Sequence, residues 1–340
     1  MNPPRIVFVG SVNTSRTTLE SLLRNHCQVV GVLELASSAS RHVSGFAPLA
    51  DIVEGTNIPS ETFEKINEPQ VKALVERWQP DLLFVVGLSQ LVGEDLLNLP
   101  TVGAVGFHPT RLPKGRGRAP YAWLSLGETE AAATFFLMDE GTDSGPILVQ
   151  EPFEVSANDY ASDIEQSIHD AIRRGLDRWL PQLNAGEWAP EPQDHSQATY
   201  MGKRTPSDGL IDWQKSATTI ASQVRAASRP FPGAYTYLGD SKLIIWRASV
   251  AVDCNHHGVA GRVLSFTNES QPLIQTGDGA LLVEEFELVS DSLDANKLRI
   301  GSQLGYFLEN EVHRLRKKVA SLEEQLNAVM ERLNRRIIKE

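Results

Sequence analysis

Apolar segments alternate with amphipathic ones through the first half of the chain. Residues 5–10, 29–35 and 80–87 are short and almost wholly apolar, which is typical of strands buried on both faces of a sheet. Between these runs, residues 17–25 and 71–78 carry apolar side chains at helical spacing. Buried strands that alternate with amphipathic helices predict βαβ units, so we expect an α/β domain with a Rossmann-like parallel sheet. Ligands of such sheets bind beyond the carboxyl ends of the strands.

The pattern changes in the second half of the chain. Residues 135–155 have the pattern of strand, loop and strand, and residues 161–183 that of one long helix. The stretch 184–202 is rich in Pro, Gly and polar residues, and short strand-like runs separated by turn residues follow it. We therefore expect the α/β domain to span residues 1–190. A linker and a small all-β, OB-like barrel would then occupy residues 191–308.

The last segment, residues 309–340, has the heptad pattern of a coiled coil. Its apolar residues recur at alternating steps of three and four, and it contains no proline. One alternative is a single amphipathic helix packed on its own domain. We favour a homo-oligomer formed through residues 312–337, in which this apolar seam packs against the seam of another copy. The seam is expected to fray at Arg336. The pattern leaves the number of helices open. The seam places Val312, Val319, Leu326 and Leu333 at position a, and Leu315, Leu322 and Val329 at position d.

Composition and charge narrow the class of protein. Of the 340 residues, 41% are hydrophobic, and the net charge is −11, as in an ordinary globular protein. Without residues 309–340 the chain carries 24 Lys/Arg against 37 Asp/Glu, which weighs against a nucleic-acid substrate. Two cysteines cannot make a disulfide framework. No apolar run approaches the roughly 18 residues of a membrane span, and the chain opens without the layout of a signal peptide, so we expect a cytoplasmic protein.

Candidate chemistry centres on His108, which ends an apolar run. Pro109 favours extended backbone at His108, and in an extended segment Gly106 lies on the same face. Asp143 lies in a Gly-rich polar loop between two apolar runs, and an aspartate can orient a histidine and stabilise its protonated form. Neither loop has the spacing of metal ligands, so we expect no metal. The residues themselves predict a proton-accepting histidine with an orienting carboxylate.

A known motif resembles the sequence around these residues. The stretch GFHPTRLPKGRGRAP, residues 106–120, is similar to N-x-H-P-S-x-L-P-x-x-R-G-x-A-P, and MDEGTDSG, residues 138–145, resembles the D-x-G loop that follows that motif. Both belong to the formyltransferases that use N10-formyltetrahydrofolate. The resemblance runs in matching order from about residue 5 to residue 305. Residues 203–246 are similar to the linker and C-terminal domain shared by methionyl-tRNA formyltransferase and the domain that formylates UDP-4-amino-4-deoxy-arabinose.

This resemblance implies a reaction in which an amine attacks the formyl carbon of N10-formyltetrahydrofolate and tetrahydrofolate leaves. It implies that His108 polarises the formyl group and stabilises the oxyanion, or relays a proton. Asp143 would position His108 and assist proton transfer. By the same resemblance, the folate would contact Gly87, Leu88, Ser89, Gln90, Asp139, Glu140, Gly141 and Thr142, and the acceptor would contact Gly10, Asn13, Thr14, Arg116, Arg118 and Arg204.

The sequence departs from the motif at Gly106, where the family has asparagine. Loss of one oxyanion donor of this kind costs roughly 10²–10³ in rate. A backbone amide, the Thr110 hydroxyl, a fixed water or His108 itself could substitute. A second interpretation is altered chemistry, because the hydrolase domain of formyltetrahydrofolate dehydrogenase also lacks this asparagine and releases the formyl group to water. A third is a pocket that has lost catalysis.

The function we expect is formyl transfer to a primary amine of a nucleotide-linked amino sugar. The acidic body of the chain and the resemblance of the second domain favour a sugar over tRNA. The alternatives are a formyltetrahydrofolate hydrolase, a methionyl-tRNA formyltransferase and a non-catalytic folate-binding scaffold whose coiled coil recruits partners. Retention of both His108 and Asp143 argues against the scaffold.

Overall fold

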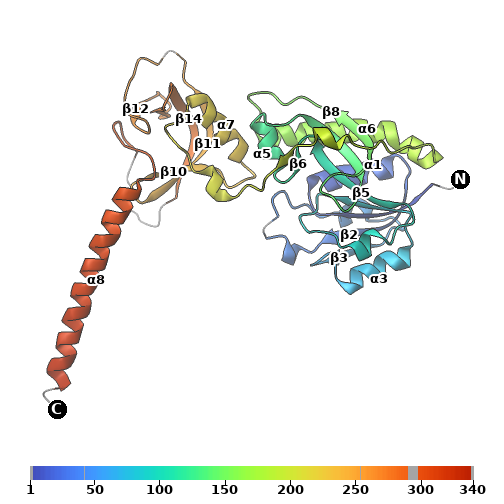
Figure 1. Cartoon of the computed structure of the whole chain (residues 1–340), viewed down its shortest axis with the longest axis horizontal. Coiled ribbons are helices and arrows are strands. Elements are labelled where there is room, and N and C mark those ends of the chain that lie inside the picture. Colours follow the sequence, from blue (N-terminus) through green and yellow to red (C-terminus); the bar gives the residue numbers. More distant parts are fainter. Residues whose placement is uncertain (1–2, 42, 253, 290–297, 338–340) are drawn as a thin grey trace.

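A computed structural model shows the chain folded into two bodies, from the second of which one long helix projects (Figure 1). The first body is built on a seven-stranded sheet and the second on a five-stranded sheet. The described residues are 3–41, 43–252, 254–289 and 298–337, with the backbone alone described for residues 310, 311 and 332–337.

The large sheet has the strand order β3-β2-β1-β4-β5-β7-β8. Strands β1 to β5 pair in parallel, whereas β7 runs antiparallel to both β5 and β8. The expected parallel sheet is thus confirmed for its first five strands, and β7 and β8 form a hairpin because the loop between them is too short for a crossover. The strands are β1 (Arg5–Gly10), β2 (Gln28–Leu35), β3 (Ser60–Phe63), β4 (Leu82–Val86), β5 (Gly103–Thr110), β7 (Ala131–Leu137) and β8 (Ile147–Pro152).

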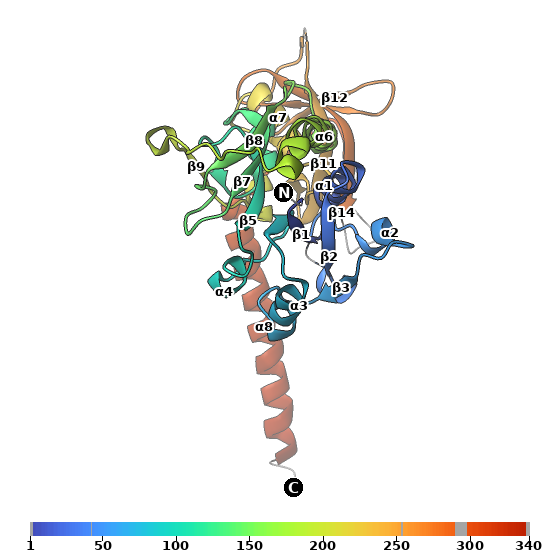
Figure 2. The same cartoon turned by 90° about the vertical axis from the view of Figure 1, so that its right-hand side faces the viewer.

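Helices cover both faces of this sheet. Leu19 and Ile168 pack from α1 and α6 on one face, whereas Val75 and Leu96 pack from α3 and α4 on the other. Both views show α1 and α6 on the opposite side of β1 and β2 from α3 (Figures 1 and 2). The helices of this body are α1 (Asn13–Arg24), α2 (Ala50–Val53), α3 (Pro69–Trp78), α4 (Glu94–Leu97), α5 (Pro120–Ser125) and α6 (Ala161–Ala185), with a 3-10 turn η1 (Ser37–Ala39).

The strand order reverses between β1 and β4. From β1, the chain adds β2 and β3 on one side, and β4 and β5 on the other. The crevice outside the carboxyl ends of the strands at such a switch point is where open α/β sheets bind ligands. The fold therefore directs attention to the residues that follow β1, β4 and β5.

The second body confirms the expected all-β domain, with one helix packed on it. Its strands are antiparallel in the order β10-β11-β14-β13-β12. Ile220 and Val224 of α7, both fully buried, fill its apolar core. Its elements are η3 (Pro206–Gly209), α7 (Ala217–Ala227), β10 (Ala234–Leu238), β11 (Ser241–Val250), β12 (Val263–Phe266), β13 (Pro272–Gln275) and β14 (Ala280–Val289).

The linker between the bodies folds back onto the first one. Its strand β9 (Tyr200–Met201) pairs in parallel with β6 (Arg116–Gly117), which lies in the motif loop. The turn η2 (His195–Gln197) precedes β9, and Glu191 bridges to Ile147 at the start of β8. The segment that the sequence marks as a boundary is therefore part of the wall around the motif.

The last helix, α8 (Leu308–Ile337), extends away from both bodies in Figure 1, and its C-terminal part projects beyond them in Figure 2. An ion pair between Arg314 Nη1 and Asp240 Oδ2, at 2.6 Å, ties its first turns to the second body. The apolar seam side chains from Val312 to Val329 are 38–62% exposed, so among the described residues the alternative of a helix packed along its own domain is wrong. None of the helices among the described residues combines the length and the apolar character that crossing a membrane requires.

Candidate functional site

The carboxyl ends of β1 and β4 meet at the switch point. The hydroxyl of Ser11 donates to the carbonyl of Gly87 at 2.9 Å, and that of Ser15 donates to the carbonyl of Val86 at 2.7 Å. A β-carbon at Gly87 would collide with the side chain of Val12, so the two segments pack in direct contact. The segment that follows β1 and the turn that begins at Gly87, both predicted to contact ligands, are thus neighbours in the fold.

Helix α1 begins at Asn13, four residues before the helical pattern that the sequence predicts from residue 17. The hydroxyl of Ser15 accepts hydrogen bonds from the backbone amides of Ser11 and Val12, both at 3.1 Å, and so stabilises the helix start. Asn13 donates from Nδ2 to Oε1 of Glu165 at 3.1 Å, and Thr14 is buried. Both residues thus lie in the first turn of α1 rather than in an open loop. The buried Gly10 ends β1.

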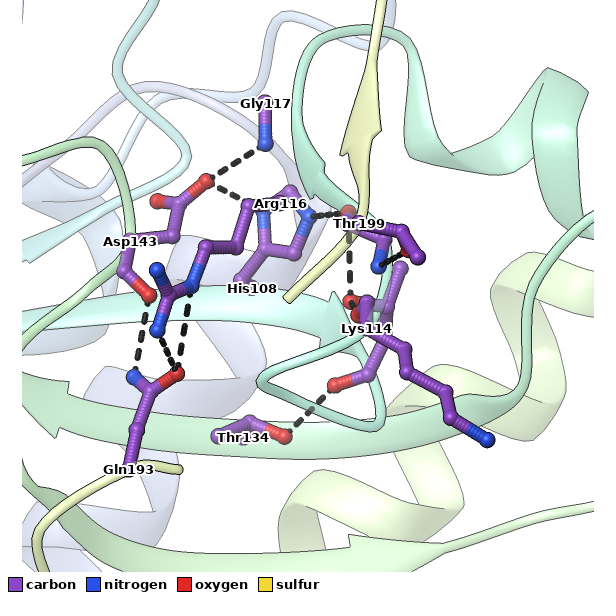
Figure 3. Close-up of polar contacts among 10 residues, drawn as sticks. His108, Lys114, Arg116, Gly117, Thr134, Asp143, Gln193 and Thr199 are labelled. Atoms are coloured by element: carbon purple, nitrogen blue, oxygen red, sulfur yellow. Dashed lines mark hydrogen bonds and ion pairs between the residues drawn. The ribbon is translucent and has the colours of Figure 1, made fainter. Parts of the chain in front are cut away.

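The structure brings His108 and Asp143 together (Figure 3). Nε2 of His108 lies 2.8 Å from the carbonyl oxygen of Gly115, and because a carbonyl only accepts, Nε2 carries the hydrogen. Nδ1 lies 3.6 Å from Oδ2 of Asp143, which is beyond hydrogen-bond distance. A proton on Nδ1 would convert this contact into an ion pair. The two groups can therefore accept one proton between them.

Asp143 presents one carboxylate oxygen to its neighbours and leaves the other one open. Oδ2 accepts a hydrogen bond from the Gly117 amide at 2.8 Å and faces His108. No hydrogen bond to Oδ1 is made within the part of the chain that the structure describes. The side chain of Asp143 is 19% exposed, against 7% for that of His108. A ligand amine would therefore find Asp143 more accessible than the imidazole ring.

A linker residue holds the loop of Asp143 in place. The backbone of Asp143 has φ of 50°, a left-handed conformation that aspartate tolerates better than most residues. Gln193 donates from Nε2 to the carbonyl oxygens of Asp143 at 2.9 Å and Gly145 at 2.7 Å. Its Oε1 in turn accepts from Nη2 of Arg116 at 2.6 Å (Figure 3). The linker thus fixes the position of the carboxylate beside His108.

Arg116 requires a correction to the sequence-based interpretation. We predicted that it contacts substrate, but it is only 1% exposed. Besides Gln193, its guanidinium bonds to the hydroxyl of Tyr200 and to Nδ1 of His195, both at 3.1 Å. Burial and this set of partners make Arg116 part of the framework between the motif loop and the linker, and remove it from the surface that an acceptor could reach.

Close backbone approach explains glycine in the motif loop. Gly117 has φ of 111°, and a β-carbon there would lie 2.5 Å from the carbonyl oxygen of Met201 in β9. The neighbouring Gly115 donates its amide to the hydroxyl of Thr199 at 2.8 Å. The linker therefore shapes both the amide that bonds Asp143 and the carbonyl that bonds His108.

The space beside Gly106 is filled. A β-carbon there would lie 2.8 Å from Cζ of Phe136 and 3.1 Å from Cγ of Met138. Phe136 pairs with Gly106 across β5 and β7, so the two residues share one face of the sheet, and Phe136 is only 4% exposed. The aromatic ring accordingly occupies the room that an asparagine side chain would need. Glycine at this position follows from that packing.

The hydroxyl of Thr110 is also committed. It donates to the carbonyl oxygen of Lys114 at 2.9 Å, with the carbonyl of Gly115 at 3.3 Å, and Thr110 is fully buried. A hydroxyl has a single proton, so this one is not available to an oxyanion without breaking a loop contact. Of the substitutes considered for the missing asparagine, the structure thus disfavours Thr110.

The two loops predicted to contact folate differ in their hydrogen bonds and in their exposure. The Gln90 side chain accepts from the amide of Ile66 and donates to the carbonyl of Glu64, both at 2.8 Å, so it fixes its own loop. Asp139 Oδ1 accepts from the amide of Gly141 at 3.0 Å and from the hydroxyl of Ser144 at 2.6 Å. Leu88 is half-buried, whereas Ser89, Glu140 and Thr142 are exposed. Residues 139–142 of the second loop are all exposed and therefore accessible to a ligand.

Arg118 follows β6 and Arg204 follows β9, the two strands through which the motif loop and the linker pair. Arg118 is exposed, and its amide donates to the carbonyl of Met201 at 3.0 Å. The guanidinium of Arg204 stacks over the ring of Trp123, with 5.5 Å between Cζ and the ring centroid. Both remain candidates for an anionic acceptor.

Sequence reasoning missed Gln193 and Thr199. Both lie in the Pro- and Gly-rich stretch that predicted a boundary, and neither carries a motif or a periodic pattern. Their roles depend on the return of the linker to β6, which no local signal reveals. Across the described residues, no three His, Cys, Asp or Glu side chains form a group suited to a metal ion.

Comparison with known proteins identifies the family to which this chain belongs. Formyl transferase matches residues 4–180, and the formyl transferase C-terminal domain matches residues 203–299. The first match alone covers more than half of the chain and includes His108 and Asp143.

Solved structures share the fold at low identity. HypX from Aquifex aeolicus in complex with tetrahydrofolic acid is 17% identical with a TM-score of 0.60, over 84% of this chain and 44% of that one. This chain thus spans less than half of the HypX chain. WlaRD, a sugar 3N-formyl transferase crystallised with dTDP and 5-N-formyl-THF, is 19% identical with a TM-score of 0.61, over 88% of this chain and all of that one.

A third structure is the N-formyltransferase from Helicobacter canadensis in complex with folinic acid and dTDP-3-aminofucose. It is 18% identical with a TM-score of 0.59, over 84% of this chain and 99% of that one. Identities this low support the fold, while the family matches support membership. The chain belongs to the formyl transferase family, whose formyl donor is N10-formyltetrahydrofolate.

Proposed function

We propose that this protein transfers the formyl group of N10-formyltetrahydrofolate to a primary amine, and that the amine belongs to a nucleotide-linked amino sugar. The observation that carries the proposal is the pairing of His108 with Asp143 beside the switch point of the sheet, with Nδ1 facing Oδ2 at 3.6 Å. An amine that forms an amide must lose a proton. This pair supplies a place for that proton.

The division of labour follows from the hydrogen bonds. The amine nitrogen forms a bond to the formyl carbon of the donor, the bond between that carbon and N10 breaks, and the proton lost by the amine is available to N10 of the leaving tetrahydrofolate. Oδ1 of Asp143, which has no partner among the described residues, accepts a hydrogen bond from the attacking amine. His108 keeps its Nε2 hydrogen on the Gly115 carbonyl, so Nδ1 takes the proton and Asp143 stabilises the resulting imidazolium.

The acceptor class rests on separate support. Among the structural neighbours, WlaRD was crystallised with dTDP and the Helicobacter canadensis enzyme with dTDP-3-aminofucose. The net charge of this chain, −11, does not favour a large polyanion such as tRNA. Arg118 and Arg204 would meet the diphosphate of a nucleotide sugar. We further propose that the exposed loop of residues 139–142 and the Gly87–Gln90 turn hold the folate.

A second function is favoured by one observation. Phe136 fills the space beside Gly106, so the side-chain oxyanion donor of the family has no room there. The formyl group would then be released to water, and the protein would be a formyltetrahydrofolate hydrolase. In the transferase that we favour, a backbone amide or a bound water takes the place of that donor.

The acceptor is tested by incubating the protein and N10-formyltetrahydrofolate with UDP- and dTDP-linked amino sugars and methionyl-tRNA, and analysing products by mass spectrometry. We expect a formamide on one sugar nucleotide and none on methionyl-tRNA. Formylated methionyl-tRNA alone would overturn the proposed acceptor.

A further inference from the structure

Helix α8 carries an apolar seam that no other segment of the described chain covers. Seven described residues form the seam along one face of the helix, and an ion pair near the start of the helix ties it to the second body. Leu308, the first residue of the helix, extends by one position the seam read from the sequence, whereas the side chain of Leu333 lies outside the described residues. The exposed fractions are 65% for Leu308, 38% for Val312, 48% for Leu315, 52% for Val319, 54% for Leu322, 62% for Leu326 and 51% for Val329.

Such a helix is not self-sufficient in water. Helical stability comes mainly from packing of an amphipathic face, and this face runs along 30 residues, about 45 Å at 1.5 Å per residue. Figure 1 shows α8 projecting away from the second body, to which the Arg314–Asp240 pair ties it near its start, so no segment of the described chain lies over the seam. The partner must therefore come from another molecule.

The chemistry of the seam selects the partner. Spacing of 3.5 residues matches a second helix in knobs-into-holes packing, in contrast to a flat protein surface. Val312 and Val319 at position a, with Leu315 and Leu322 at position d, are the combination that favours two parallel strands. The flanking charges suit a copy of the same helix, because Lys318 at position g would face Glu323 at position e of a second copy.

We propose that α8 pairs with α8 of a second copy in a parallel two-stranded coiled coil, which places the two formyltransferase bodies at the same end of that coiled coil. Each seam residue of one helix then packs against the same residue of the second copy. This dimer is independent of the reaction that the bodies catalyse.

The first test measures the mass of the full chain by sedimentation equilibrium at micromolar concentration. The wild type is expected at twice the 37.4 kDa of one chain. Val319→Lys/Leu322→Lys is expected at the mass of one chain. The matched control is Ala320→Lys/Ser321→Lys, which adds the same charge at the neighbouring outward positions b and c and is expected to remain a dimer.

Folding of the variants is monitored through the tryptophans. All six lie before residue 247, outside α8, so near-UV circular dichroism reports the folding of the two bodies and not that of α8. An unchanged spectrum with a halved mass assigns the loss of mass to the seam. A wild-type chain that sediments as a monomer or trimer, or a seam variant that stays a dimer, would overturn the proposal.

Orientation is tested by disulfide formation. Burial raises the pKa of Cys27 to about 11, so that thiol is unreactive, and Cys254 is replaced by serine. In a parallel pair Leu322→Cys faces its own copy and crosslinks under mild oxidation. In an antiparallel pair centred on the same layers, Leu322→Cys would instead crosslink to Val319→Cys in a mixture of the two proteins, and that result would overturn the parallel arrangement.

Discussion

Nδ1 of His108 lies 3.6 Å from Oδ2 of Asp143, while Nε2 of the same ring is held by the Gly115 carbonyl. This arrangement leaves Nδ1 as the basic nitrogen and places a carboxylate where a proton on it would be stabilised. We expect His108→Ala and Asp143→Asn each to lower the rate of formyl transfer by roughly 10²–10⁴. The exposed His257→Ala, in a loop of the second body, is the control and should keep the full rate. Rates are followed by the appearance of tetrahydrofolate, and an active Asp143→Asn protein would remove the carboxylate from the mechanism.

The Gln193 amide connects the linker to the Asp143 loop. In Gln193→Leu the buried guanidinium of Arg116 loses an acceptor and two loop carbonyls lose a donor, so we expect the free energy of unfolding to fall by roughly 2–3 kcal/mol. Urea denaturation measures this loss. The control is Gln197→Leu, because the side-chain amide of Gln197 donates to the exposed carboxylate of Asp194.

Positioning by Gln193 has a second readout, the kcat of formyl transfer at a temperature at which the variant stays folded. Gln193 holds the Asp143 loop through the carbonyls of Asp143 and Gly145, so a displaced carboxylate should assist the transfer less and kcat should fall in Gln193→Leu. An unchanged kcat in a variant of lowered stability would show that Gln193 is structural alone.

The filled space beside Gly106 predicts the cost of any side chain there. Gly106→Ala would force its β-carbon to within 2.8 Å of Phe136, and we expect a loss of roughly 1–3 kcal/mol in the free energy of unfolding. Gly202→Ala is the matched control, because nothing lies within 4 Å of its β-carbon position. Thermal unfolding of both variants measures the difference. Equal midpoints would mean that Phe136 moves aside, and then the room for an asparagine would exist.

Glu165 predicts an acid-dependent contribution to stability. The neighbouring His169, with its Nε2 at 3.8 Å, and the amide of Asn13 hold the pKa of Glu165 below its ordinary value, against the opposing effect of burial. A carboxyl with a depressed folded pKa stabilises the fold above its unfolded pKa of about 4.3, and this contribution disappears as the pH falls through the folded pKa.

The measurement is urea unfolding of wild type and Glu165→Gln from pH 7 to pH 3. We expect wild type to be the more stable at pH 7 and the difference to shrink below about pH 4.3. Glu154→Gln, at an exposed position in the connection between β8 and α6, serves as control. A constant difference across this range would contradict the assignment.

Local patterns were enough to predict most of the fold. The apolar run of β1 and the heptads of α8 were read from periodicity alone, since each element carries its own signal. The start of α1 was placed too late, because its first turn is polar and stabilised by the hydroxyl of Ser15 rather than by apolar spacing. Periodicity does not register a capping bond.

Only the site residues that take part directly in the chemistry could be predicted from the motif. His108 and Asp143 were found from their loops and from the resemblance, and the structure brings them together. The burial of Arg116 depends on Gln193, which lies 77 residues further along the chain, so no local pattern distinguishes Arg116 from an exposed loop arginine. The packing of Phe136 on Gly106 likewise depends on the pairing of β5 with β7.

The most direct test of the account is the consumption of N10-formyltetrahydrofolate by the purified protein, with and without amino-sugar nucleotides, together with an assay for formate. We predict consumption that requires the amine, yields the formamide and is lost in His108→Ala. Formate released at the same rate without any amine would contradict transfer, and would mean that the closed space beside Gly106 marks a hydrolase.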